Sequence, residues 1–348
     1  MLTAMREIDG AWGEGGGPLI RTAVALAAIT HTPIRVRNVR ANRRPTGLAP
    51  QHLTAVRAVA TLCGAETQGL EPRATAFEFA PGRIGAGEFR FDVGTAGSVT
   101  LLAQALLPVL ASAPGPCTVS LIGGTDVRAA PPFDYFRHVL LAHLAALGVP
   151  VRCTLRRRGY YPRGGGEIEF TTEPARPRAL CFDDAALPRA ILGRAHTDHL
   201  PPHVATRMSD AARAHWLRQT SEIEAEVAAE SANPGGSIVL WTRGGGSVLG
   251  AGRVAERGVC AEALGAAVGA ELVADLAAGV ALDLHAADQL LVWLALAHGE
   301  SVFTTREVTH HARTAMWLIE QFVPVQFEIG SDREPGAQRV YVRPRRRT

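Results

Sequence analysis

Apolar residues recur along the chain with helical and strand-like spacing in a repeated order. Each cycle begins with glycine or other small residues, continues with an apolar helix, a strand and a loop, and closes with an amphipathic helix and a strand. We interpret the cycles as three copies of one unit of roughly 70 to 90 residues. In the first two copies we expect helices at 18–29, 51–63, 99–110 and 134–147, and strands at 33–39, 75–81, 88–93, 117–122 and 167–172. We place the strands 75–81 and 88–93 together at the start of the second copy.

The third copy occupies the late stretch 284–322. An apolar helix there carries Asp288 and Gln289 near its start, and a strand-like run at 301–307 leads into His310 and His311. A second amphipathic helix follows at 312–322. A histidine between the end of a strand and the start of a helix is in a place where side chains commonly reach ligands.

The spacing between the second and third copies is too long for a direct connection, so a further unit must lie between them. A proline-containing break in the pattern at 173–177 precedes this inserted unit. Beyond it we expect strands at 190–195 and 237–242, a glycine turn at 244–246, and helices at 204–216 and 261–276. We therefore predict a large domain formed by 1–181 and 278–348, with a smaller α/β domain, 182–277, inserted into it.

Composition is ordinary for a globular protein, with 47% apolar and 20% charged residues in 348. The first residues lack the pattern of a signal peptide, and every apolar run is too short or too interrupted to span a bilayer. We therefore expect a cytoplasmic protein without a membrane partner. The five cysteines form no C-x-x-C pair, which disfavours a zinc site or a disulfide framework.

All 36 basic residues in the Lys+Arg count are arginine. A lysine nucleophile, a Schiff base and a P-loop lysine are therefore excluded. Arginine binds phosphate with two parallel hydrogen bonds, so a formal net charge of only +3 still permits a local phosphate-binding surface.

Two early segments are candidates for such a surface. The cluster at 13–17 places glycines before a helix that carries Pro18 in its first turn, with Glu14 and Arg21 close by, which suits a phosphate and a metal ion. The alternative is a tight turn that only needs glycine. Arginines at 40, 43 and 44, followed by His52, suit an anionic polymer, and the alternative is a solvated charged turn.

Three later features have two interpretations each. Gln104 is the strongly polar side chain of an apolar helix, where it either bonds to its own helix or reads a nucleobase edge. The arginines and tyrosines of 156–167 form either a groove for phosphates and bases or a hairpin with a charged edge. The arginines of 343–347 add RNA affinity or form a disordered end.

Several runs together resemble RNA 3'-terminal phosphate cyclases, in order from near the N-terminus to about Phe327. They are GEGGG from Gly13, RANRRPTGLAPQHL from Arg40, GTAGSVTLLAQALLP from Gly94, GGTDV with APPFDYFRHV, RRGYYPRGGGE, HAADQLLVWLALA and the helix from His311 to Phe322. RRGYYPRGGGE is highly specific to that family, whereas the triple glycines alone are not.

The resemblance implies an α+β fold of three repeated units, each a four-stranded sheet with two helices, plus a smaller inserted α/β domain. It also implies an ATP-dependent ligase reaction in three steps. A histidine takes AMP from ATP and passes it to an RNA 3'-phosphate, and the neighbouring 2'-hydroxyl then closes a 2',3'-cyclic phosphate and expels AMP. The implied partners are ATP, RNA with a 3'-terminal phosphate, and a divalent cation, magnesium or manganese.

The resemblance also implies roles for single residues. The family's histidine precedes the phenylalanine that ends the next helix by eleven positions, so Phe322 assigns the nucleophile to His311, with His310 as its neighbour. Glu14 and Asp288 resemble the carboxylates near the phosphates and the metal. The positions that resemble ATP contacts are Glu14, Gln104, Pro131, His285, Asp288 and Gln289. For RNA we choose, by charge and motif position, Arg21, Arg40, Arg43, Arg44, His52, Arg128 and Arg163.

Two other functional classes remain as alternatives. One is a non-catalytic relative in RNA processing or ribosome assembly, which His311 with Glu14, Asp288 and Gln289 argues against. The other is an enolpyruvyl transferase of similar repeat architecture, which the absence of lysine disfavours. The sequence leaves monomer and homodimer open.

Overall fold

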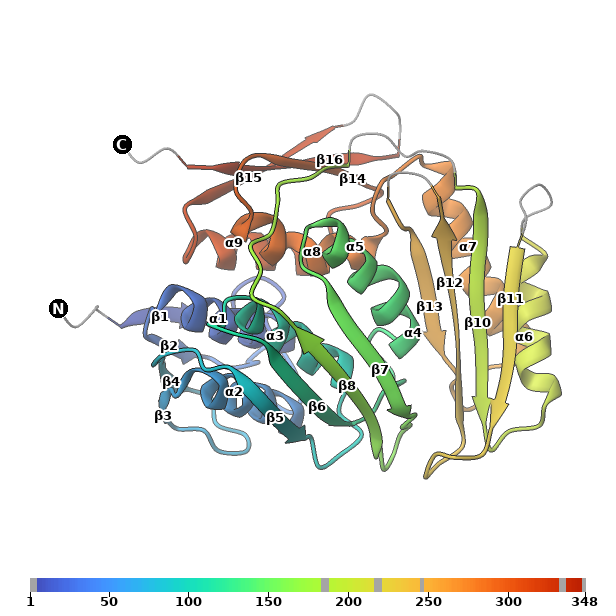
Figure 1. The fold of residues 1–348 in the computed structure, drawn as a ribbon, viewed down its shortest axis with the longest axis horizontal. Helices are drawn as coiled ribbons and strands as arrows, with labels where there is room; N and C mark the ends of the chain where they lie inside the picture. Colours follow the sequence, from blue (N-terminus) through green and yellow to red (C-terminus); the bar gives the residue numbers. More distant parts are fainter. Residues whose placement is uncertain (1–4, 183–187, 216–220, 245–246, 332–335, 346–348) are drawn as a thin grey trace.

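The computed structural model describes residues 5–182, 188–215, 221–244, 247–331 and 336–345. Within these ranges the chain forms four sheets of four strands each, and pairs of helices pack against them. Figure 1 shows three of the units grouped around central helices, with the fourth unit at one side. None of the described helices is both long and apolar enough to cross a bilayer.

The first repeat has the order strand, helix, strand, helix, strand, strand. Its elements are β1 Arg6–Asp9, α1 Gly17–Thr30, β2 Ile34–Arg37, α2 Pro50–Cys63, β3 Glu66–Gln68 and β4 Phe77–Ala80. The sheet order is β1-β2-β4-β3, with β1 parallel to β2 and the other pairs antiparallel.

The second repeat reproduces this topology with the sheet order β5-β6-β8-β7. Its elements are β5 Gly87–Asp92, α3 Val99–Ala111, β6 Cys117–Gly123, one continuous helix in three segments (α4 Phe133–Tyr135, the π-helical η1 Phe136–Leu140 and α5 Leu141–Ala146), β7 Val151–Arg157 and β8 Gly166–Thr172.

The third repeat has the equivalent order β9-β14-β16-β15, and a long insertion separates its first strand from its first helix. Its elements are β9 Cys181–Phe182, α8 Leu284–Leu296, β14 Ser301–Thr305, α9 His310–Glu320, β15 Val325–Ser331 and β16 Gln338–Pro344. The predicted α+β class with three equivalent units and an insertion is confirmed.

The inserted unit has a sheet of its own, in the order β11-β10-β12-β13. Its elements are β10 Ala190–Asp198, α6 His203–Arg213, β11 Ser221–Ala228, β12 Gly235–Arg243, β13 Gly250–Val254 and α7 Ala261–Ala277. Helices α6 and α7 cover one face of this sheet, and α4 of the second repeat packs against β12 and β13. A separate apolar cluster around Met208, Ile238 and Leu272 forms its core.

Some predicted boundaries differ from the structure. The strand expected at 75–81 is β4 and belongs to the first sheet rather than to the second copy. Phe182 lies in the third sheet, at the proposed start of the inserted domain, and 183–187 lie outside the described residues. The predicted helix end at 216, the turn residues 245–246 and the tail residues 346–347 also lie outside them.

Helix α1 lies at the centre of the three repeats. It packs against α2, α3 and α9, and Ile20, Val24 and Ala27 along it are at most 1% exposed. A helix that is apolar nearly all round is typical of a buried core element. The packing brings the first turn of α1 beside that of α9, where Pro18 and Leu19 share a small cavity with His311 and Thr314.

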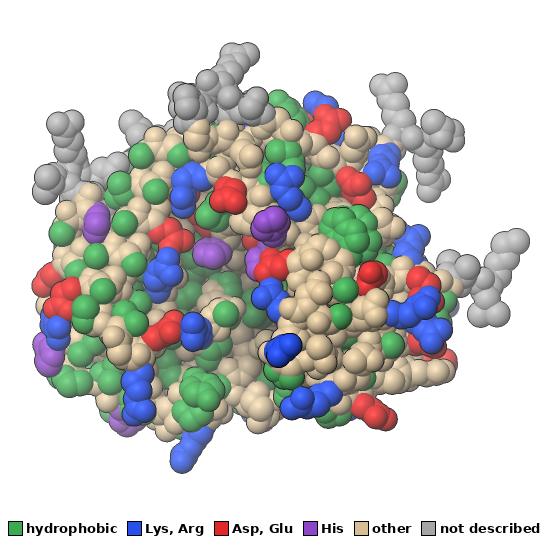
Figure 2. All heavy atoms as spheres, turned by 180° about the vertical axis from the view of Figure 1, so that it is seen from behind, with side chains coloured by type: hydrophobic (Ala, Val, Ile, Leu, Met, Phe, Trp, Pro, Cys, Tyr) green, Lys and Arg blue, Asp and Glu red, His purple; other side chains and the backbone are tan. Residues whose placement is uncertain are grey.

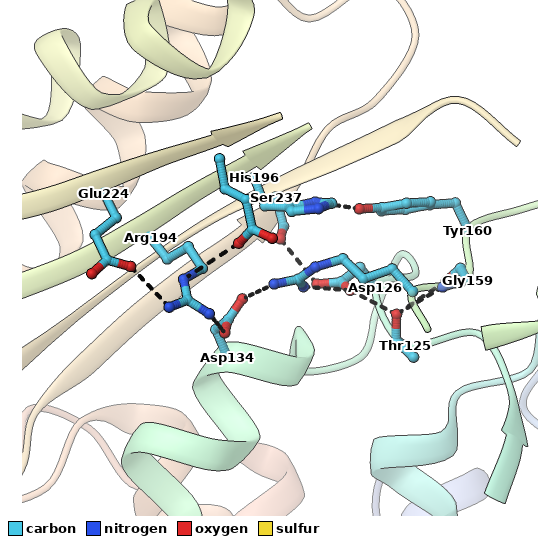
Figure 3. A network of polar contacts seen from close by, with 11 residues as sticks. Thr125, Asp126, Asp134, Gly159, Tyr160, Arg194, His196, Glu224 and Ser237 are labelled. Carbon is cyan, nitrogen blue, oxygen red and sulfur yellow. Dashed lines mark hydrogen bonds and ion pairs between the residues drawn. The ribbon is translucent and has the colours of Figure 1, made fainter. Parts of the chain in front are cut away.

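A buried polar network connects the inserted unit to the second repeat (Figure 3). Arg158 follows β7, is 4% exposed, and donates to Asp126 at 3.1 Å and to Asp134 at 2.7 Å. Ser237 of β12 donates to the second oxygen of Asp126 at 2.9 Å. Although burial opposes it, the two aspartates raise the pKa of Arg158, so the guanidinium stays charged.

Tyr160 extends this network into β10. Its hydroxyl lies 2.5 Å from His196 Nδ1, and its carbonyl accepts from Asn233 Nδ2 at 3.3 Å. Burial, assisted by Arg158, lowers the pKa of His196 to about 4, so the imidazole is neutral near pH 7 and its Nδ1 accepts a hydrogen bond from the Tyr160 hydroxyl. The segment 156–167 is therefore a hairpin, and Arg158 and Tyr160 serve the contact between units rather than an open groove.

We expect Arg158→Met to lower the free energy of unfolding by about 3–5 kcal/mol, because it leaves the buried Asp126 without its cation and Asp134 with only the more distant Arg194, at 3.5 Å. Urea unfolding followed by circular dichroism measures the loss. The matched control is Arg156→Met, since Arg156 is 56% exposed and pairs with Glu169 at the surface. That loss should be at most about 1 kcal/mol. Equal losses in the two variants would contradict a structural role for the buried cluster.

Candidate active site at the meeting point of the repeats

A cavity of about 940 Å³ lies where the three repeats and the inserted unit meet. Figure 2 shows a hollow near the centre of one face, with histidine, arginine and acidic side chains at its edge. The cavity brings together most of the residues that the sequence predicts. These are Glu14, Arg21, Arg40, Arg43, His52, Gln104, Arg128, Pro131, His285, Asp288, Gln289 and His311.

His311 stands in the first turn of α9. The Thr309 side chain caps this helix by accepting from Ala312 N at 2.9 Å, and its hydroxyl donates to Asp288 Oδ1 at 2.7 Å. His311 Nδ1 lies 2.9 Å from Glu14 Oε2. Because a carboxylate oxygen accepts, this contact places a proton on Nδ1. In a neutral imidazole of this tautomer the lone pair is on Nε2.

Glu14 is fixed by contacts from two repeats. Its backbone N–H donates to Thr314 Oγ1 of α9 at 3.2 Å, and its carboxylate also pairs with Arg43. The preceding Gly13 has φ of +59°, and a Cβ there would lie 2.5 Å from Thr314 Oγ1. The turn therefore needs glycine at 13 to bring Glu14 onto α9.

The N-terminus of α1 opens into the cavity. Gly15, Gly16 and Gly17 line it, and the amides of a helix N-terminus favour an anion. A Cβ at Gly17 would lie 2.5 Å from His52 Nε2 and 2.9 Å from an Arg21 nitrogen, so glycine lets both side chains approach the backbone.

Arg21 and His52 carry different charges at this helix end. Burial lowers the pKa of Arg21 to about 10, which leaves it cationic at pH 7. Burial, with Arg21 and Arg40 nearby, lowers the pKa of His52 to about 3, so His52 is neutral. The pair offers one fixed positive charge and one neutral polar group.

The opposite wall is formed by α3 and α8. Gln104 Nε2 donates to Gln289 Oε1 at 3.0 Å, which joins the two helices. The carbonyl of Pro131 accepts from Thr100 at 2.8 Å. Burial raises the pKa of Asp288 to about 6, and the hydrogen bond from Thr309 opposes this shift. Because this pKa lies below 7, Asp288 is ionised at pH 7, and keeping the buried charge lowers the free energy of unfolding.

The start of α8 holds His285 at the cavity. Asp283 is 1% exposed and accepts from the backbone of His285 and Ala286 and from the Tyr135 hydroxyl. The Tyr135 ring meets His285 edge-on, with 6.1 Å between ring centroids. His285 Nε2 also lies 3.7 Å from Glu271 of α7.

Three predicted residues lie apart from the cavity lining. Arg44 and Arg163 are exposed in the loop before Pro45 and in the β7–β8 turn, and His310 is exposed at the first position of α9. Arg40 lines the cavity but donates to the carbonyls of its own loop, at Pro45 and Gly47.

The sequence reasoning missed the wall that the inserted unit supplies. Arg253 of β13 and Glu256 after it line the cavity, and Glu256 lies 3.5 Å from Arg128 of the second repeat. Arg253 pairs with Glu271 at 2.9 Å. No local pattern in the sequence marks these residues, because their position depends on how the inserted unit packs.

Comparison with known proteins identifies relatives along almost the whole chain. The sequence model of the family described as RNA 3'-terminal phosphate cyclase matches residues 12–329. Proteins of that name are similar in Nitrosospira multiformis (48% identity, 93% of each chain covered), Pyrobaculum neutrophilum (42%, 92% of this chain and 94% of the other) and Methanopyrus kandleri (43%, 97% and 98%). The enolpyruvyl transferase NikO from Streptomyces tendae matches structurally with a TM-score of 0.38 at 13% identity, over 97% of this chain and 48% of the other, which is too weak to inform function.

We expect Asp288→Asn to raise the free energy of unfolding at pH 7 by about 1–3 kcal/mol. The Asp288 carboxyl has a pKa of about 6 in the folded protein, against an ordinary value of 3.8, so the unfolded chain binds fewer protons between these pH values. Stability therefore falls as pH rises through this window in the unaltered protein. Thermal unfolding of both proteins at pH 4 and pH 7 measures the difference, which should nearly vanish at pH 4.

The control for this experiment is Glu88→Gln, at an exposed position of β5. It should leave stability unchanged at both pH values. A loss of stability in Asp288→Asn at pH 7 would refute the inference that ionised Asp288 is unfavourable in the fold.

Proposed function

Because the chain belongs to the RNA 3'-terminal phosphate cyclase family, and is an enzyme of that class, we propose that it uses ATP to convert an RNA 3'-terminal phosphate into a 2',3'-cyclic phosphodiester. The observation that carries the mechanism is the contact of His311 Nδ1 with Glu14 at 2.9 Å inside the shared cavity. This contact orients the ring so that Nε2 is the nucleophilic atom.

In the first step His311 Nε2 attacks the α-phosphorus of ATP. A nitrogen–phosphorus bond forms, the bond to the bridging oxygen breaks, and pyrophosphate leaves with the electron pair. The ring becomes positively charged while Nδ1 keeps its proton, and the carboxylate of Glu14 stabilises that charge. A neutral imidazole needs no additional base for this attack.

In the second step an oxygen of the RNA 3'-phosphate attacks the same phosphorus. The bond to His311 breaks, and the ring returns to its neutral form. The product is RNA-(3')pp(5')A. In the third step the adjacent 2'-hydroxyl attacks the RNA 3'-phosphorus, and the bond from that phosphorus to the oxygen of AMP breaks. AMP leaves with the electron pair and takes up the hydroxyl proton, which closes the cyclic ester.

The cavity offers separate places for the two substrates. We assign the nucleotide to the wall of Gln104, Pro131, His285, Asp288 and Gln289. We assign the phosphates to the N-terminus of α1. The residues proposed for the RNA end are Arg21, Arg40, Arg43, Arg44, His52, Arg128 and Arg163, of which Arg44 and Arg163 would contact RNA outside the cavity.

Glu14 and Asp288 are the side chains suited to hold a divalent cation. Magnesium is commonly bound by one or two carboxylates together with substrate phosphates, and both residues line the cavity. When bound, the cation would offset phosphate charge that repels an attacking nucleophile. The pKa of Asp288 of about 6 leaves its carboxylate available at pH 7.

We expect His311→Asn to abolish transfer of label from α-³²P-ATP to the protein and to lower cyclisation by more than about a thousandfold. His310→Asn is the matched control, because His310 is exposed beside the cavity lining. It should keep both activities. Labelling is read by acid-labile, base-stable radioactivity, and cyclisation by phosphatase resistance of a 3'-phosphorylated RNA.

Two outcomes would argue against the proposal. Labelling that persists in His311→Asn but is lost in His310→Asn would transfer the role to the other histidine. An unaltered protein that takes no label and cyclises no RNA would favour a non-catalytic relative. Release of phosphate from phosphoenolpyruvate would instead favour an enolpyruvyl transferase.

A further inference from the structure

Two tryptophans stack on one another beside the candidate active site. Trp12 precedes the glycine turn, and Trp317 lies on α9. Their ring centroids are 4.1 Å apart, and the ring planes differ by 11°. Trp12 is nevertheless 37% exposed. Because Trp317 covers one face of its indole, the exposed surface of Trp12 lies outside that face.

Backbone hydrogen bonds connect this tryptophan pair to the turn and the helix that carry the proposed catalytic residues. The Trp12 carbonyl accepts from Gly15 N at 3.0 Å, so the indole belongs to the same turn as Glu14. The neighbouring Glu14 N–H bonds to Thr314, midway between His311 and Trp317 on α9. Trp317 follows His311 by six positions. Trp317 therefore lies about 9 Å along the helix axis from His311 and about 120° around it. The pair is close to the cavity but not part of its lining.

Cationic side chains flank the pair. The loop of Arg40, Arg43 and Arg44 is held next to Trp12, since Asn42 Nδ2 donates to the Ala11 carbonyl at 2.9 Å. Arg313 is exposed on α9 one turn before Trp317, at a spacing that places the two side chains on the same face. Exposed aromatic rings beside arginines are the combination by which proteins bind single-stranded nucleic acid.

We propose that Trp12, supported by Trp317, is a stacking platform for a nucleobase of the RNA substrate, close to its 3' end. The cations beside it would bind the adjoining phosphates. Trp317 holds the indole in one orientation, so little freedom is lost when a base stacks on it. This inference rests on the proposed function, because it identifies the substrate near His311 as single-stranded RNA.

A packing role for the pair is the competing explanation. Trp12 also joins the turn of the first repeat to α9, and this contact contributes to the position of Glu14. If packing were its only role, loss of the indole would impair self-adenylylation with ATP alone as much as any step with RNA. A platform would act on RNA binding and would depend on the presence of a base.

The test is a double-mutant cycle between the protein and the RNA. A 3'-phosphorylated oligonucleotide carries an abasic residue at each of its last four positions in turn, and fluorescence anisotropy without ATP gives the Kd. For the unaltered protein we expect one position at which base removal raises Kd by about 5- to 150-fold. Trp12→Leu should raise Kd for intact RNA by a similar factor and should be insensitive to base removal at that position.

The conservative control is Trp12→Phe, which retains an aromatic face and should keep most of the affinity and the abasic sensitivity. Self-adenylylation of Trp12→Leu with ATP alone is measured in parallel. It should fall if the tryptophan pair serves only packing. Abasic sensitivity that is equal in the unaltered protein and Trp12→Leu, or absent from both, would overturn the platform. A loss of self-adenylylation as large as the loss of RNA affinity would also overturn the platform. Because the binding assay needs no turnover, its result is independent of whether the protein cyclises RNA.

Discussion

The packing of α9 on α1 is the constraint on which the candidate active site depends. Glu14 and Thr314 are 300 positions apart in the chain, yet the backbone of one bonds to the side chain of the other. This contact exists because the apolar α1 is buried among helices of all three repeats. Its first turn, which presents backbone amides, thereby meets the first turn of α9, which presents His311. Two helix N-termini then face one cavity, and both favour negative charge there.

The inserted unit completes this arrangement from the side. Arg158 and Tyr160 connect the hairpin of the second repeat to β10 and β12, and the neighbouring β13 brings Arg253 to the cavity. A buried ion pair costs desolvation energy and adds stability only when its geometry is satisfied. The cluster around Arg158 meets that condition. Arg158 donates to Asp126 and to Asp134, and Ser237 donates to the other carboxylate oxygen of Asp126. The cavity wall therefore depends on a polar contact outside the cavity.

Much of the fold was predictable because helix periodicity and glycine positions are local signals. The helices beginning near Gly17, Pro50 and Val99 were expected within a few residues. The strands that were missed are β1, β3, β7, β9, β11, β13, β15 and β16. All of them except β16 lie at sheet edges, where exposed polar side chains weaken the apolar pattern. The alternation of Glu and apolar residues in β11 was a usable signal. Motif resemblance identified Glu14, Asp288 and His311, which the structure brings to one cavity. The composition of 156–167 left a groove and a hairpin open, because a sequence pattern does not distinguish a buried arginine such as Arg158 from one that binds RNA.

The most direct test of the central claim is to locate AMP on the protein. Incubation of the full chain with ATP and magnesium, followed by proteolysis at neutral or alkaline pH and tandem mass spectrometry, identifies the modified residue. If His311 is the nucleophile, AMP is found on His311 and not on the adjacent His310. Attachment of AMP to any other residue, or an unmodified His311 in a protein that cyclises RNA, would contradict the mechanism.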